Sequence, residues 1–204
     1  YGGGSMSRLI TNAIRSTSAS ADAITMDGSG NVTFPANATC SGTATGFGGG
    51  KLLQVQQTVK TDTTSESVSS GVPTSTIFLP VNITPASASN KILITVTANV
   101  SDHGIVALIL QKNGSNLDAA TGDAAGSRER TTASTYMTSD SHLCTINATY
   151  LDTAGSTSQI TYGFKLFVQD NNTSTIYLNR MVSSYDYVYG YRSPSMIQVI
   201  EFSA

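Results

Sequence analysis

From Lys51 to its end, the chain alternates apolar and polar residues with a period of two, and short runs of turn residues interrupt the alternation. A period of two places every second side chain on one face of an extended strand, whereas a helix needs a spacing of three to four. The alternating segments are 51–59, 77–83, 92–100, 104–112, 144–150, 160–168, 176–178 and 196–202. This pattern predicts an all-β domain with about eight strands of ordinary length, arranged as a β-sandwich of the jelly-roll type.

Two of these segments carry a more specific prediction. Segment 104–112 is apolar on both parities, so we expect a strand covered on both faces, and Asn113-Gly114 after it predicts a tight hairpin. Pro80 lies inside segment 77–83 and predicts an edge strand or a bulge, because proline cannot donate a hydrogen bond to a neighbouring strand.

Residues 6–47 differ from the rest because their apolar residues are few and scattered. Two very short extended pieces, 23–26 and 31–35, flank a glycine-rich turn, and residues 8–15 could form a short helical turn. A two-stranded ribbon of this size is marginal in water. The arm is therefore either disordered or paired with identical arms of neighbouring chains. The apolar residues that such a shared shaft would cover are Ile24, Met26, Val32 and Phe34.

The chain divides into four parts by composition. Residues 1–5, Tyr-Gly-Gly-Gly-Ser, read as the remnant of an expression tag, and we expect the natural chain to begin at Met6. Residues 6–47 form the extended arm, and residues 48–50 are a glycine linker. Residues 51–204 form the sandwich domain, which we call the knob.

The composition excludes several classes of protein. Only 12% of residues are charged, against about 25% in average soluble domains, while 28 serines and 28 threonines keep the surface polar. A net charge of −2 argues against nucleic-acid binding, and no apolar run reaches the roughly 18 residues that membrane insertion requires. Two cysteines exclude a disulfide scaffold, and Cys40 and Cys144 are most simply free thiols.

Segment 184–192 places a tyrosine at every second position, and an arginine follows the last one. An extended strand would present all four rings on one face. Tyrosine combines a large apolar ring with a polar tip, which suits a protein interface, a sugar-stacking surface or the cover of a core. These three interpretations stay open, with an interface favoured. The candidate receptor or interface residues are Tyr185, Tyr187, Tyr189, Tyr191 and Arg192.

Candidate catalytic and metal-binding residues are few. Asp102, His103, Asp140 and His142 could in principle supply a metal site or a serine hydrolase base, but their spacing matches no known ligand pattern. A glycosidase would need two carboxyl groups about 5 to 9.5 Å apart in a cleft, for which the chain shows no signature. We therefore expect no catalytic residues, no metal and no cofactor, and a loop-shaping ion pair between Asp123 and Arg128.

Several segments resemble the tip domains of short phage tail fibres, especially those of marine and cyanobacterial phages. Their order along the chain is the most persuasive feature. The arm segment 27–35 is similar to fibre-shaft segments in which three chains wind together. The matching segments are 27–35, 48–55, 58–63, 83–94, 122–130, 150–162 and 176–180.

This resemblance implies a homotrimeric virion protein. The N-terminal arm would attach to other phage tail or baseplate proteins, and the knob would provide adhesion by recognising a receptor or polysaccharide on the host surface. The protein would be assembled in the host cytoplasm and located in the tail of the virion. Two alternatives remain: a structural protein that only decorates the capsid or tail, and a depolymerase of host polysaccharide.

Overall fold

The computed structural model describes residues 13–14, 17–18, 20–34, 51–169 and 173–204. The chain divides into two compact units, Tyr1–Gly48 and Gly49–Ala204, which are described separately below. The residues assigned to a tag remnant (1–5) and to the glycine linker (48–50) lie outside the described ranges.

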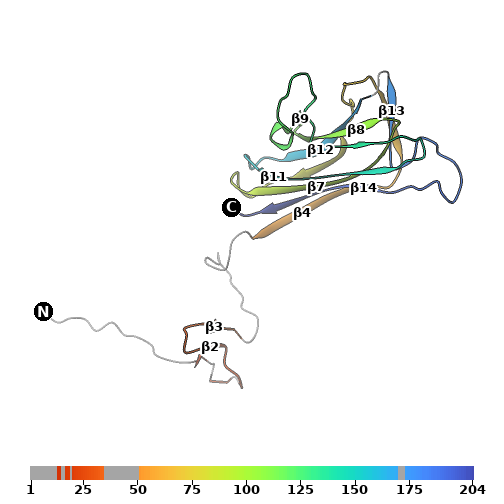
Figure 1. Ribbon diagram of the computed structural model, residues 1–204. Helices are drawn as coiled ribbons and strands as arrows, with labels where there is room; N and C mark the ends of the chain where they lie inside the picture. The colour runs from red at the N-terminus through yellow and green to blue at the C-terminus, as the bar shows by residue number, and fades with distance from the viewer. Residues whose placement is uncertain (1–12, 15–16, 19, 35–50, 170–172) are drawn as a thin grey trace. The chain divides into compact units, whose positions relative to one another are not determined.

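The N-terminal unit contains a small antiparallel sheet in the order β1 (Ala13–Ile14), β2 (Ile24–Met26) and β3 (Val32–Thr33) (Figure 1). β2 and β3 form the expected hairpin. One carboxylate oxygen of Asp27 accepts hydrogen bonds from the backbone N–H groups of Ser29 and Asn31, each at 2.9 Å. The predicted helical turn is wrong at residues 13–14, which are extended, and the rest of it lies outside the described residues.

The described part of this unit contains no buried side chain. Ile24 and Met26 are half-buried, whereas Val32 and Phe34 are 52% and 43% exposed. A sheet of two- and three-residue strands cannot enclose an apolar core by itself. Of the four residues predicted for a shared shaft, Val32 and Phe34 are thus left exposed, and Ile24 and Met26 are only partly covered.

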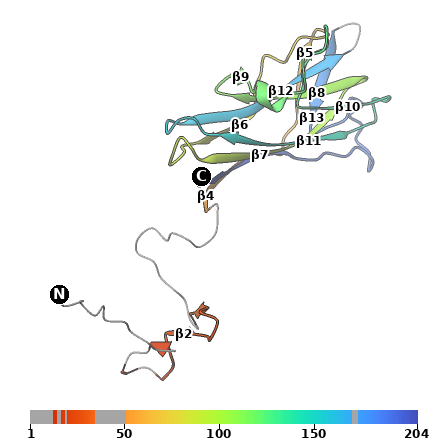
Figure 2. The ribbon, with the colours of Figure 1, turned by 60° about the vertical axis from the view of Figure 1, so that its left-hand side comes forward.

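The second unit is built almost entirely of β-strands (Figures 1 and 2). One antiparallel sheet has the order β4-β14-β7-β13-β5, with β11 also paired to β7, and the other has the order β10-β8-β12-β6, with β9 paired to β8. The strands are β4 (Leu52–Lys60), β5 (Thr64–Val68), β6 (Phe78–Ile83), β7 (Lys91–Ser101), β8 (Ile105–Lys112), β9 (Ser115–Asn116), β10 (Ala133–Tyr136), β11 (Cys144–Thr153), β12 (Ile160–Gln169), β13 (Ser174–Leu178) and β14 (Ser195–Phe202). A short 3-10 helix covers Asp118–Ala120.

The inward faces of the two sheets share one apolar core. Ile94 and Val96 of β7 are fully buried in the same cluster as Leu108 of β8 and Phe164 of β12. The Phe164 ring also stacks on Phe78, with the two ring centroids 5.8 Å apart. The predicted all-β class is confirmed, and the packing of the two sheets is sandwich-like.

All eight predicted segments lie on strands, and the details of two of them are confirmed. β8 is buried on both faces, because Ala107 and Ile109 form a second, smaller cluster with Phe167 on the side away from the core. After β8, Asn113 and Gly114 both have positive φ, as a tight hairpin requires.

Pro80 lies in β6, which is the edge strand of its sheet, as predicted. The pairing of β6 with β12 is also irregular between Tyr162 and Phe164. Gly163 sits at this irregularity, where a Cβ atom would approach the side chain of Ile77 and lie 3.0 Å from the carbonyl oxygen of Phe78. β12 therefore needs a glycine where the backbone of its neighbour β6 approaches it closely at the irregularity.

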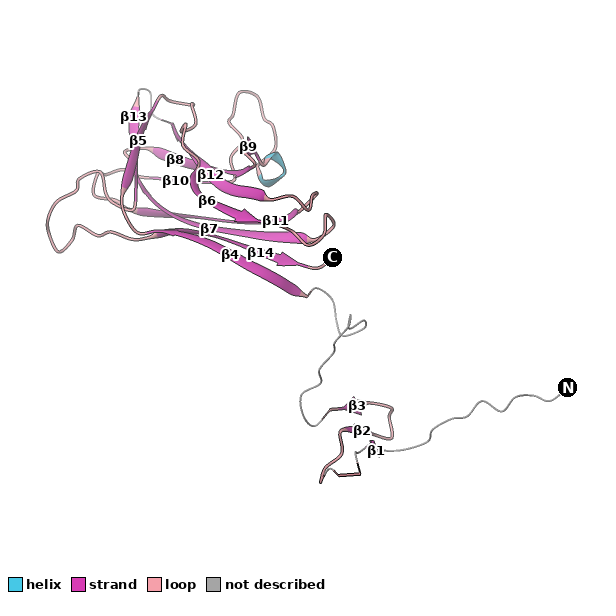
Figure 3. Cartoon of the chain, turned by 180° about the vertical axis from the view of Figure 1, so that it is seen from behind, coloured by secondary structure: helices cyan, strands magenta, loops and turns pink. Residues whose placement is uncertain are grey.

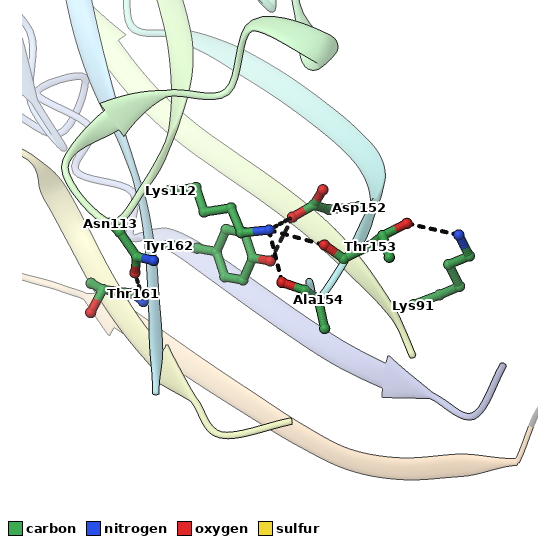
Figure 4. Close-up of polar contacts among 8 residues, drawn as sticks. All are labelled: Lys91, Lys112, Asn113, Asp152, Thr153, Ala154, Thr161 and Tyr162. Carbon is green, nitrogen blue, oxygen red and sulfur yellow. Dashed lines mark hydrogen bonds and ion pairs between the residues drawn. The ribbon is translucent and has the colours of Figure 1, made fainter. Parts of the chain in front are cut away.

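A charged cluster fastens the two sheets together at one end of the sandwich (Figure 4). The Nζ atom of Lys112 donates to the Asp152 carboxylate at 2.7 Å and to the carbonyl oxygens of Thr153 and Ala154 at 2.9 and 3.1 Å. The Tyr162 hydroxyl donates to the same Asp152 oxygen at 2.7 Å. Burial and the adjacent carboxylate both raise the pKa of Tyr162, so the phenol stays protonated and keeps donating.

Candidate binding loop

The tyrosine-rich segment lies in the connection between β13 and β14, residues 179–194, which we call the tyrosine loop. Residues 185–191 do not form an extended strand, because this part of the chain bends and turns. The backbone N–H of Gly190 donates to the carbonyl oxygen of Tyr187 at 2.8 Å and closes a turn. The four rings are therefore not presented on one face of a strand.

A buried asparagine anchors the beginning of the loop. The Nδ2 group of Asn179 donates to the carbonyl oxygens of Lys60 and Asp62 at 2.8 and 2.9 Å, and its Oδ1 atom accepts from the Ser195 hydroxyl at 2.6 Å. Asn179 also has a φ of 66°, a conformation that asparagine tolerates better than most residues. The amide thus joins both ends of the loop to the turn that follows β4.

The next residues are fixed to the sandwich as well. The Arg180 guanidinium lies 4.0 Å from the centroid of the Tyr177 ring, and the backbone N–H of Ser183 donates to the carbonyl oxygen of Asp140 at 3.0 Å. At the far end, the Nδ2 group of Asn99 donates to the carbonyl oxygen of Pro194 at 2.7 Å. Both ends of the loop are therefore held, while its central residues extend away from the core.

The tyrosines between these anchors are exposed. Tyr185, Tyr187, Tyr189 and Tyr191 are 60%, 72%, 73% and 62% exposed, and Arg192 is exposed as well. The interpretation that the rings cover the core is thus wrong for the single chain. The reason is that the loop lies beyond the end of the sandwich, where no strand pairs with it.

The four tyrosines nevertheless come together around one hollow of about 240 Å³, which Ser141, Met181 and Gly190 also line. The rings of Tyr185 and Tyr187 are tilted against each other, with centroids 5.9 Å apart. Met181 is buried, and together with the rings it makes the hollow mainly apolar. Phenol groups can donate and accept hydrogen bonds at its rim.

Gly190 is required for this arrangement. A Cβ atom at this position would overlap the carbonyl oxygen of Tyr185 and lie 3.2 Å from that of Tyr187. The chain can fold back on itself here because glycine has no side chain.

A second hollow, of about 610 Å³, lies over β8 and β12 on the side of their sheet that points away from the core. Ala107 and Phe167 contribute to its floor, and Arg128 and Glu129 belong to the loop beside it. The predicted ion pair between Asp123 and Arg128 is wrong, because Arg128 donates instead to the carbonyl oxygen of Ala125 at 3.3 Å. The sequence does not reveal this hollow, since its walls come from segments that are distant along the chain.

The candidate metal and hydrolase residues are not assembled into a site. Among the described residues, no group of three or more His, Cys, Asp or Glu side chains is placed to hold a metal ion. The Asp102 carboxylate is buried and accepts from the Ser174 hydroxyl at 2.5 Å, whereas His103 is exposed. Cys144 is a half-buried free thiol, and Cys40 lies outside the described residues.

Comparison with models of known protein families finds no match for this chain, and comparison with curated proteins finds none either. Within the part of the chain that the structure describes, no helix has both the length and the apolar character needed to cross a membrane.

Proposed function

We propose that this protein is a phage virion protein, a homotrimeric tail fibre whose knob binds a polysaccharide or receptor on the host surface without cleaving it. The observation that carries this proposal is the tyrosine loop. It presents four exposed tyrosines around a small hollow, and hydrogen bonds hold both of its ends. Exposed aromatic groups on a fixed support are typical of a recognition surface.

The order of the strands supports a jelly-roll knob. The four-strand series β4-β14-β7-β11 faces the series β6-β12-β8-β10, and the chain crosses repeatedly between the two sheets. A jelly roll is a double sheet of eight antiparallel strands, and viral structural proteins use it widely. In this assignment, β5, β9 and β13 are additions to the eight-strand framework.

The N-terminal unit supports assembly into a trimer. Its described residues form a sheet without a core, and Val32 and Phe34 remain exposed. Three arms wound together would cover these side chains, and each fully covered side chain contributes about 1.5–3 kcal/mol. Attachment of the arm to other tail or baseplate proteins, and hence location in the virion tail, rests on the resemblance to phage fibres.

The chemistry of the tyrosine loop favours a polysaccharide as the receptor. Aromatic rings offer flat apolar faces, and the phenol groups offer hydrogen bonds to hydroxyl groups. Single contacts of this kind are weak. A trimer with three loops would bind a repeating polymer through avidity without needing further contacts.

The test is the binding of the full chain to a panel of immobilised bacterial surface polysaccharides, with Tyr187→Ala and Tyr189→Ala as variants. Loss of either ring should weaken binding to the bound polysaccharide at least about tenfold, whereas Tyr187→Phe should retain most of it. Tyr136→Ala is the matched control, because Tyr136 is 66% exposed but lies on β10 and not in the loop.

Polysaccharide binding that neither Tyr187→Ala nor Tyr189→Ala weakens would overturn the role of the loop. A wild-type chain that binds no polysaccharide and no host cell would favour the alternative of a structural decoration protein. Release of reducing ends from the polysaccharide would contradict the non-enzymatic part of the proposal.

A further inference from the structure

The sheet that contains β4, β14, β7 and β11 carries an apolar row on the side away from the core. Val55 pairs with Ile200, Ile200 with Leu93, and Leu93 with Leu151, so four apolar residues line up across four strands. Val55 and Leu151 at the two ends of the row are 45% and 54% exposed, and the two residues between them are half-buried. All four face outward, because their neighbours along each strand face the core.

Further apolar residues flank the row where β4 begins and β14 ends. Phe202 pairs with Leu52, and Leu52 and Leu53 are 54% and 37% exposed. On the other side of the row, an uncharged polar row crosses the same strands. Its members are Gln57, Gln198, Thr95 and Thr149.

The outward residues of these four described strands, which we call the outer face, are nearly free of charge. Lys91 is the single charged residue among them, and its Nζ atom donates to the Thr153 hydroxyl at 2.8 Å. The other outward residues are Leu53, Val55, Gln57 and Val59 on β4, Met196, Gln198, Ile200 and Phe202 on β14, Leu93, Thr95, Thr97 and Asn99 on β7, and Thr145, Asn147, Thr149, Leu151 and Thr153 on β11. Exposed apolar residues that form a contiguous surface mark a protein interface.

We propose that the outer face binds other copies of this chain and forms the interface between knobs in the assembled fibre. This inference rests on the proposed function for the number of copies. Amide and hydroxyl groups both donate and accept, so the polar row can form hydrogen bonds with an identical row. A face with a single charged residue also largely avoids the like-charge repulsion that identical, highly charged faces would suffer.

The connectivity of the chain supports the same partner. β4 begins at Leu52, where the sandwich unit receives the chain from the N-terminal unit, and the apolar row lies only a few residues further along. In the proposed fibre, the copies are tethered to one another through their arms, which raises the effective concentration of one apolar row near another. An unrelated partner protein would not have this advantage.

The proposed interface also leaves the tyrosine loop free. The loop precedes Ser195 at one end of β14, whereas the row crosses β14 at Ile200, about 17 Å further along an extended strand. In Figure 1 the blue loop between β13 and β14 lies at the opposite end of the sandwich from the C-terminus. Association through the apolar row and recognition through the tyrosine loop are thus compatible in one knob.

The test is the molar mass of the full chain, measured by light scattering and sedimentation velocity over a range of concentrations. The variant is Val55→Lys combined with Leu151→Lys, which places like charges on both ends of the row in every copy. We expect the wild-type chain to be a trimer and the variant to need at least a tenfold higher concentration to associate. The control is Val72→Lys, because Val72 is 50% exposed but lies in the turn between β5 and β6.

Circular dichroism establishes that each variant is folded, and Val55→Gln with Leu151→Gln is the milder substitute if the lysine variant is not. An unchanged trimer in the folded double variant would overturn the outer face as the interface and leave the fibre proposal intact. A monomeric wild-type chain would overturn both the interface and the trimer. Polysaccharide binding by the tyrosine loop is a separate measurement that neither outcome decides.

Discussion

At the scale of single residues, the buried carboxylate of Glu201 is saturated with hydrogen bonds. Glu201 on β14 is fully buried, and its carboxylate accepts from the Asn90 side chain at 2.6 Å, the Gln54 side chain at 2.5 Å and the backbone N–H of Ala86 at 2.8 Å. A buried carboxylate is tolerated only when its oxygens are satisfied in this way. Glu201 thereby holds the loop between β6 and β7 onto the end of β14.

Glu201 should make the stability of the protein sensitive to acid. Burial raises the pKa of Glu201, but the hydrogen bonds from Asn90, Gln54 and the backbone outweigh it and hold the pKa below the ordinary value of 4.5. A lowered pKa contributes stability above the unfolded value, and this contribution is lost as the pH falls through the folded value. We expect the melting temperature to fall below about pH 4.5, because the unfolded chain then binds more protons than the folded one.

The variant Glu201→Gln should be less stable at pH 7 by about 1–3 kcal/mol and should lose less stability in acid. Thermal unfolding followed by circular dichroism between about pH 3 and pH 7 measures both effects. The melting temperature of Glu201→Gln should still fall somewhat in acid, because hydrogen bonds also lower the pKa of Glu66 in spite of its burial. Glu129→Gln is the control, since Glu129 is exposed. If the melting temperatures of Glu201→Gln and the wild type fall equally steeply as the pH is lowered, this account is contradicted.

At the scale of secondary-structure elements, alternation is not sufficient to make a strand. Segments 185–191 and 195–202 both alternate with a period of two, yet only the second is extended. In β14, the inward residues Ile197 and Val199 are fully buried, and strands pair with it on both sides. In the tyrosine loop, the alternate position holds Asp186 and Val188, and Val188 is 83% exposed. A strand forms where neighbours supply hydrogen bonds and burial, which this segment lacks.

The variant Gly190→Ala should disrupt the loop and leave the sandwich intact. The added Cβ atom would overlap the carbonyl oxygen of Tyr185, so the turn must open and the tyrosines must separate. We expect polysaccharide binding to weaken about tenfold, while the free energy of unfolding changes by no more than about 0.5 kcal/mol. Binding and thermal unfolding of the same samples measure the two quantities. Gly122→Ala is the control, because a Cβ atom there would meet nothing within 4 Å.

At the scale of the whole molecule, the two units differ in what they can do alone. The sandwich unit has a continuous core that both sheets share, whereas the described residues of the N-terminal unit contain no buried side chain. The sandwich unit, whose strands are coloured magenta in Figure 3, thus has the buried apolar core that folding as a single chain requires. In the proposed trimer, other copies would cover the apolar residues of the arm, and assembly and folding of the arm would then be one process.

Deletion of residues 6–47 should therefore leave the knob folded but weaken the trimer and abolish attachment to phage particles. The reason is that the shared cover of Val32 and Phe34 is lost, while the outer face of the knob is kept. Sedimentation velocity measures association, and co-sedimentation with particles measures attachment. A truncated chain that attaches to particles as the full chain does would refute the role of the arm.

The strand segments of this protein were readable from local pattern. Alternation, Pro80 and Asn113-Gly114 act through nearest neighbours on the chain, so eight strands, an edge strand and a hairpin could be predicted without knowing the fold. β5 and β10 were missed because their sequences, TSESV and ASTY, are rich in hydroxyl residues and lack apolar alternation. β9 was missed because two residues are too few to show any alternation. The candidate tyrosines were likewise found by their spacing, although their conformation was not.

Contacts between segments that are distant along the chain could not be predicted from the sequence, because they depend on how the sheets assemble. Val55 and Leu151 belong to one row because two intervening strands bring them into register, and Asn179 is satisfied by backbone groups that follow β4. Neither the row nor these hydrogen bonds can be inferred from the residues that adjoin Val55, Leu151 or Asn179 in the sequence. A local pattern indicates which backbone conformation a segment prefers. The partners of its side chains depend instead on which strands pair, and burial and hydrogen bonding over the whole domain determine that pairing.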